Sequence, residues 1–186
     1  MNALRLFPKM VIAVGIAFAL AGLVAAGAGV YIRGFVVQQL AAQQITTPED
    51  ASIPNTPVTN MATALSMANI IQHHAAESGK GLTYAQMGRF AVESGEPKGT
   101  NNADEALKDA GGKPVANGAR NTQLTAAGLV TSLSLSAMAI GAAYGAIAMG
   151  IGFTVLGIVI AGLGYALLGL ITPEVARRFG VQPVAA

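Results

Sequence analysis

The chain has 186 residues, of which 53% are hydrophobic and only 11% are charged, whereas about 25% of the residues in a typical soluble domain are charged. The mean hydropathy of +0.53 and two long stretches without charge, residues 10–32 and 121–173, predict an all-α integral membrane protein. The absence of cysteine excludes disulfide bonds and thiolate ligands. The net charge of +2 is small and dispersed, which argues against a nucleic-acid partner.

The N-terminal segment, residues 1–9, carries Arg5 and Lys9 and precedes the uncharged run 10–32. At about 1.5 Å per residue, this run is long enough to cross a hydrocarbon core of about 30 Å. The small residues of VAAGAG, 24–29, would also suit a cleavable signal peptide. The run is longer than the roughly 7–15 apolar residues of such a peptide. We therefore predict an uncleaved signal anchor with its N-terminus in the cytoplasm.

Residues 33–121 are then expected to form a small helical segment on the extracytoplasmic side. The first helix should continue past the membrane and stop before Pro48, because the residue preceding a proline disfavours helix. The three prolines of TTPEDASIPNTPVTN, 46–60, predict an irregular connection. From about Thr59, apolar residues recur at spacings of three and four, which predicts an amphipathic helix ending near Gly79 or Gly81.

A second short helix is predicted after Thr83, a candidate N-cap, in TYAQMGRFAVES. The following stretch, residues 94–120, is rich in polar residues and glycine and is interpreted as a mobile surface linker. Within this linker DEALKDA, 104–110, could form two helical turns.

The second uncharged block, residues 121–173, changes in polarity along its length. Residues 122–143 contain several Ser and Thr, whereas residues 144–172 are almost entirely apolar. A single crossing by 144–172 returns Arg177 and Arg178 to the cytoplasm with the C-terminal segment 173–186, as the positive-inside tendency favours. We predict two transmembrane helices that flank the extracytoplasmic segment. Three spans are the alternative, with two helices in this block.

In the two-span arrangement, residues 122–143 form an apolar helix on the outer side. This helix either lies in the membrane interface or extends the second span. Its apolar face needs a cover from the rest of the extracytoplasmic segment, another copy of the chain or a further partner.

Both histidines of the chain, His73 and His74, are adjacent on the last turn of the predicted helix. Adjacent helical residues point about 100° apart, so the pair cannot chelate one ion alone. A metal site would need Glu77 or residues of another chain as further ligands. The simpler interpretation is that the histidines interact with the helix dipole and the last carbonyl groups. A pH-sensing role is a third interpretation.

Small residues at four-residue spacing predict close helix packing in lipid. They are Ala17, Ala21, Ala25 and Gly29 in the first span, with Gly141 and Gly145 as a GxxxG motif in the second block. No P-loop, dinucleotide fingerprint, nucleophile elbow or zincin motif occurs in the sequence.

Three stretches that follow the N-terminal span resemble a known protein family. They are VVQQLAAQQITTPEDA, HHAAESGKGLTYAQM and LTAAGLVTSLSLSAMAIGAAYGAIAMGIGFTVLGI. Together with the span they cover about half the chain, and their order resembles a family of small uncharacterised actinobacterial membrane proteins. The family pattern of a histidine, a glycine turn and TYA is similar to the run from His74 to Ala85, with Gly79, Lys80, Thr83 and Tyr84. The polar stretch from Gly95 to Asn121 departs from that pattern, because the family passes quickly to its last helix.

Members of this family often carry the name aromatic ring-opening dioxygenase, and we reject that activity for this chain. A non-haem iron site of this type needs something like two histidines and a carboxylate that converge on one metal. Here the two histidines are adjacent on a short exposed segment.

Two functional hypotheses follow. The first is a non-catalytic protein of the plasma membrane without a cofactor, an accessory or structural subunit of a larger envelope complex or a homo-oligomer, with the lipid bilayer as its surroundings. The alternative is an extracytoplasmic binding or sensing module for a metal, a lipid or a small apolar ligand, with His73, His74, Glu77 and Tyr84 near its site.

Overall fold

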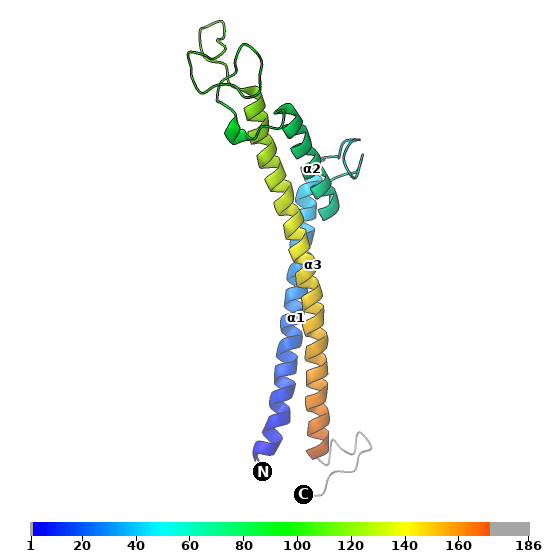
Figure 1. Ribbon diagram of the computed structural model, residues 1–186. Coiled ribbons are helices and arrows are strands. Elements are labelled where there is room, and N and C mark those ends of the chain that lie inside the picture. The colour runs from blue at the N-terminus through cyan, green and yellow to red at the C-terminus, as the bar shows by residue number, and fades with distance from the viewer. Residues whose placement is uncertain (1, 172–186) are drawn as a thin grey trace. The chain divides into compact units, whose positions relative to one another are not determined.

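The computed structural model describes residues 2–171 and consists of helices joined by loops (Figure 1). The helices are α1 (Asn2–Ala42), α2 (Met61–Ser78), the short 3-10 helix η1 (Tyr84–Gln86) and α3 (Gly118–Ile171). Within this part of the chain, β-structure is limited to isolated bridges. The predicted all-helical fold is confirmed, and two of the helices, α1 and α3, are long and apolar enough to cross a membrane.

The contacts divide the chain into two compact units. One unit contains the residues up to Gly34 and those from Gly141 onward, and we call it the hairpin unit. The other contains Phe35–Ile140, and we call it the loop unit.

In the hairpin unit, α1 and α3 run antiparallel along a line of glycines (Figure 1). Gly15 faces Gly157, Gly22 faces Gly150, and Gly29 faces Ala143. A Cβ atom at any of these glycines would collide with the backbone of the opposite helix. The helices therefore touch backbone to backbone, which a glycine on at least one side of each contact permits.

The spacing of these glycines is seven residues on both helices, with Gly164 as the last on α3. A seven-residue period keeps one face toward the partner when two helices supercoil gently to the left. A four-residue period drifts by about 40° per step around a helix. This drift explains why the predicted four-residue stripe does not make the contact.

Of that predicted stripe, only Gly29 lies in the glycine line. Ala17 and Ala21 are exposed, and Ala25 is half-buried. In the predicted GxxxG motif, Gly141 is half-buried, and a Cβ on Gly145 would meet open space.

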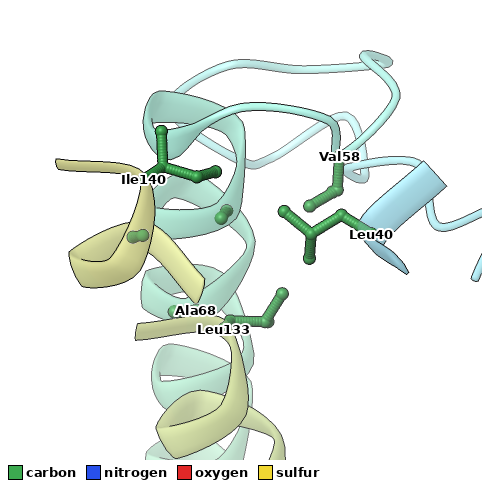
Figure 2. Packing of buried hydrophobic residues seen from close by; sticks show 7 residues of the cluster. Leu40, Val58, Ala68, Leu133 and Ile140 are labelled. Atoms are coloured by element: carbon green, nitrogen blue, oxygen red, sulfur yellow. The ribbon is translucent and has the colours of Figure 1, made fainter. Parts of the chain in front are cut away.

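The core of the loop unit gathers residues from the end of α1, the following loop, α2 and α3. Its buried members are Leu40, Val58, Ala64, Ala68, Leu133, Ala137 and Ile140. Figure 2 shows Leu40 and Val58 pointing toward each other. The regularly spaced apolar residues that predicted α2 thus face this core, and residues of α3 complete it.

Helix α2 begins and ends close to the predicted positions. The Asn60 side chain accepts a hydrogen bond from the Thr63 backbone N–H, and the Thr63 hydroxyl accepts one from the Asn60 N–H. This reciprocal capping box satisfies two donors that a helix start leaves unpaired. At the C-terminal end of α2, the backbone N–H of Gly79 donates a hydrogen bond to the Ala75 carbonyl oxygen.

Two predicted short helices are wrong. Only the 3-10 turn Tyr84–Gln86 forms after Thr83, and residues 104–110 are not helical. Both segments belong to a loop network in which the backbone of Phe90 pairs with Thr100 and with Ala116. Long-range backbone hydrogen bonds replace the local helical ones there.

The stretch predicted to be a linker has a defined hydrogen-bonded path. Asn117 is buried, and its side-chain amide donates to the carbonyl oxygens of Gly88 and Pro97 at 3.0 and 2.8 Å. Gly99, at φ +58°, packs against the same side chain. The buried Asn117 side chain thereby links its own position to the backbone at Gly88 and at Pro97.

Helix α3 runs without interruption from Gly118 to Ile171. Residues 122–143 are therefore continuous with residues 144–171, as an extension of the second apolar helix. No proline occurs between Pro114 and Pro173, so nothing removes a backbone donor inside the helix. The three-span alternative requires a turn that residues 118–171 do not contain. The predicted cytoplasmic segment 173–186 lies outside the described residues.

Candidate functional site

His74 forms the shortest polar contact around the histidine pair. Its Nε2–H donates to Asp50 Oδ2 at 2.6 Å, and both side chains are about half exposed. This hydrogen bond, followed by smaller contributions that include the charge of His74, holds the pKa of Asp50 below its usual range.

The loop 43–60 is held near α2 by a second set of polar contacts. The Ser66 hydroxyl accepts a hydrogen bond from the Ile53 N–H at 2.9 Å, and the Ser52 hydroxyl lies 2.9 Å from it. Within the loop, the buried Thr47 hydroxyl donates to the Ile53 carbonyl at 2.5 Å. These contacts fix the loop that carries Asp50.

His73 has a different carboxylate partner. Its Nε2 lies 3.2 Å from Glu77 Oε1, one turn further along α2, and both side chains are largely exposed. The two histidine rings are 6.1 Å apart at an angle of 45°. In residues 2–171, no three His, Asp or Glu side chains converge closely enough to hold an ion. The proposed metal ligands His73, His74 and Glu77 are therefore split between two pairs.

A surface groove adjoins His74 within the loop unit. It has a volume of about 440 Å³ and lies between α2 and α3, lined by Ile71, His74, Ala75, Asn121, Thr122, Thr125, Ala126 and Leu129. A neighbouring depression of about 470 Å³ shares Ile71 and Leu129 with it and is more apolar.

Tyr84, which was expected near the histidines, contacts Arg120 of α3. The Arg120 guanidinium lies over the Tyr84 ring, 4.0 Å from its centroid. Next to it, the Gln123 amide donates to the Ala75 carbonyl at 2.6 Å. These contacts join the end of α2 to the start of α3, and they are structural.

Sequence reasoning missed Asp50 and Gln123. Asp50 lies 24 residues before His74, in a proline-containing loop whose path no periodicity predicts. Gln123 reaches the α2 carbonyl across 48 residues. The sequence indicated a residue such as Gln123 only indirectly, because the last carbonyl groups of a helix have no donor within the helix and need one from another part of the chain.

No known family model, no curated protein and no solved structure matches this chain. The resemblance to the actinobacterial family thus stays a prediction from the sequence.

Proposed function

We propose that the protein is a non-catalytic integral membrane protein of the cell envelope, which uses α1 and α3 as a two-span anchor for the loop unit. Its role is that of an accessory or structural subunit of a membrane complex, or of a homo-oligomer. The observation that carries the proposal is the glycine-lined hairpin. Glycines at seven-residue spacing form the contact between its two helices, and many large apolar residues point outward.

The outward residues of the hairpin unit support a lipid environment. Leu20, Val24 and Ile158 are examples of large apolar side chains that are more than half exposed. Exposed apolar surface costs about 25 cal/mol per Å² in water. Lipid removes this cost, and the uncharged runs 10–32 and 141–171 of the two helices suit it.

A polar contact occurs where the first uncharged run ends. Arg33 Nε–H donates to the Tyr144 hydroxyl at 2.9 Å, and the guanidinium lies 5.4 Å from the centre of the Tyr144 ring. Tyrosine and arginine favour the headgroup level of a bilayer. We therefore assign Arg33 and Tyr144 to the outer membrane–water interface, with Arg5, Lys9, Arg177 and Arg178 on the cytoplasmic side.

The histidine pairs support a non-catalytic role. His73 with Glu77 and His74 with Asp50 are each about half exposed or more. Catalytic electrostatics gain their strength in sites that exclude water, and these two pairs face it.

The topology is testable because the chain has no cysteine of its own. We would introduce Glu93→Cys in the loop unit and Asn2→Cys at the N-terminus, and treat intact cells with a membrane-impermeant maleimide. Glu93→Cys should react before lysis and Asn2→Cys only after it. The reverse pattern, or equal reaction of a soluble protein, would refute the two-span anchor.

The subunit role needs a second experiment. Native mass spectrometry of the wild-type protein, gently extracted from its own membrane, should show stoichiometric partner chains or copies of itself. A bare monomer under conditions that keep other membrane complexes intact would contradict this role.

The groove beside His74 favours a second candidate function, the binding of a small apolar ligand by the loop unit. Its volume lies in the range of about 300–1,000 Å³ that is common for ligand sites. His74→Gln should then lower the retention of a ligand detected in the native mass spectrum. His73→Gln is the matched control, because His73 does not line the groove. Equal retention by both variants would exclude this function.

A further inference from the structure

Arg33 carries a positive charge that the hairpin unit does not neutralise. The described residues of this unit, 2–34 and 141–171, contain no aspartate or glutamate. The ion pairs formed within residues 2–171 do not include Arg33. The other basic residues of the described hairpin unit, Arg5 and Lys9, precede the uncharged run 10–32, whereas Arg33 follows it. Arg33 is therefore a single cation at its end of the hairpin.

The Arg33 side chain is held in place by Tyr144 and keeps donors to spare. The Nε–H donates to the Tyr144 hydroxyl at 2.9 Å, and the guanidinium carbon lies 5.4 Å from the centre of the ring. Within residues 2–171, the two terminal guanidinium nitrogens make no hydrogen bond. Arg33 is exposed, and the next residue, Gly34, has no side chain that could shield it. The terminal N–H groups are thus open to a ligand.

The Tyr144 hydroxyl supplies a further donor at the same place. A phenolic oxygen accepts hydrogen bonds and also carries a proton that it can donate. Since this oxygen accepts from Arg33, its own O–H remains for a second acceptor. The pair therefore presents several donors and a positive charge, which together suit an oxyanion.

The chemistry of the pair indicates which oxyanion fits. A planar guanidinium with free terminal nitrogens matches two oxygens of one phosphate or carboxylate. At the outer membrane–water interface, the abundant group of this geometry is the phosphate of a phospholipid. A zwitterionic headgroup brings its own cation close to Arg33, whereas a net anionic headgroup neutralises the arginine. The charge balance therefore favours an anionic phospholipid.

We propose that Arg33 and Tyr144 bind the phosphate group of an anionic phospholipid in the outer leaflet. The inference rests on the proposed function, because the membrane anchor is what places this end of the hairpin at the interface. It also accounts for an arginine on the outer side, where the positive-inside tendency disfavours one. The bound phosphate supplies the negative charge that the hairpin unit lacks.

Native mass spectrometry of the purified full chain tests the site. We would add, at equal concentrations, phosphatidylglycerol, phosphatidylcholine with the same acyl chains, or inorganic phosphate. The wild type should bind phosphatidylglycerol more tightly than phosphatidylcholine. Arg33→Gln should lower the affinity for phosphatidylglycerol by about 10- to 100-fold, which corresponds to losing hydrogen bonds to a charged group. The matched control is Arg89→Gln, since Arg89 is also exposed and lies 5.4 Å from the Phe90 ring, but belongs to the loop unit.

Two conservative variants distinguish a shaped site from general attraction between charges. Arg33→Lys keeps the charge but loses the planar pair of donors, and Tyr144→Phe keeps the ring but loses the hydroxyl. Each should lower the affinity for phosphatidylglycerol, and circular dichroism of the lipid-free variants checks that the helices are intact. Full affinity in both variants would overturn the shaped phosphate site.

Other outcomes would also overturn the inference. They are equal binding of the two lipids, equal losses in Arg33→Gln and Arg89→Gln, or displacement of phosphatidylglycerol by equimolar inorganic phosphate, which would identify a free anion as the ligand. A partner protein retained by the wild type and lost in Arg33→Gln would assign Arg33 to a protein contact instead. Labelling of Glu93→Cys in cells separates this inference from the anchor. External labelling without a lipid preference refutes only the lipid site, whereas failure of external labelling refutes the membrane anchor.

Discussion

Gly22 of α1 and Gly150 of α3 approach each other through their backbones. A Cβ atom on Gly22 would lie 2.5 Å from the Gly150 carbonyl oxygen, and one on Gly150 would lie 2.6 Å from the Gly22 carbonyl oxygen. The approach is therefore reciprocal, and neither residue can gain a side chain unless the helices separate. Close helix approach of this kind also brings Cα–H groups toward carbonyl oxygens, which adds weak attraction.

Gly22→Ala should lower the free energy of unfolding of the solubilised protein by about 1–3 kcal/mol, because the methyl group meets backbone that cannot rotate away. Gly27→Ala is the matched control on the same helix, since a Cβ there meets nothing within 4 Å. Alanine forms helix better than glycine, so the control should be neutral or more stable by up to about 1 kcal/mol. Thermal unfolding followed by circular dichroism measures both. Equal effects would contradict the backbone contact.

The pKa of Asp50 should depend on His74. Carbon-detected NMR titration should give Asp50 a pKa below that of an ordinary aspartate, and His74→Gln should raise it by removing the hydrogen bond to Oδ2. His73→Gln should change the pKa less, because His73 acts only through its more distant charge.

The sign of the linked effect on stability follows from the direction of that shift. A pKa that is lower in the folded chain stabilises the fold above the unfolded aspartate pKa, about 3.9, and this contribution is lost as the pH falls through the folded value. His74→Gln should flatten that acid dependence. An unchanged pKa of Asp50 in His74→Gln would show that the pair does not form in solution.

Asn117→Ala should loosen the loop network of residues 88–117. The substitution leaves the carbonyl oxygens of Gly88 and Pro97 without their donor, at a cost of about 1–3 kcal/mol. Hydrogen exchange should accelerate at amides such as those of Phe90 and Thr100, which pair with each other. Asn121→Ala, at an exposed position four residues later, is the control. No difference between the two variants would mean that Asn117 does not organise the loops.

Single tryptophans can locate the membrane boundary, since the chain has none. Tyr144→Trp should be quenched best by lipids brominated near the headgroup. Phe153→Trp, at the site of the edge-to-face contact with Phe18, should be quenched best by bromines deep in the acyl chains. Nine helical residues separate the two positions by about 14 Å. Identical depth profiles would refute the interface assigned to Arg33 and Tyr144.

The helices of this chain were largely predictable, because their signals are local. The periodicity from Met61 to Ala75 predicts α2, and Asn60 with Thr63 supplies the cap at its start. The uncharged runs predict α1 and α3 by composition alone. The glycine line was also visible as a seven-residue spacing from Gly15 to Gly29, but the four-residue pattern of alanines concealed it.

The contacts of the candidate site were not predictable in the same way. Asp50 meets His74 because a loop folds back from Thr47, whose buried hydroxyl organises that loop. The strand-like pairing of Phe90 overrides the helical tendency of residues 84–94 and 104–110. Tertiary hydrogen bonds decide both outcomes, and a single sequence carries no periodic signal for them.

The pairing of Gly29 with Ala143 also has a consequence for biosynthesis. More than a hundred residues separate these partners in the chain, and a ribosome adds about 5–20 residues per second. The first helix therefore exists for on the order of ten seconds before its partner is synthesised. During that time its glycine face is open to helices of other proteins, so a chaperone or rapid insertion that shields this face would increase the yield of correctly paired hairpin.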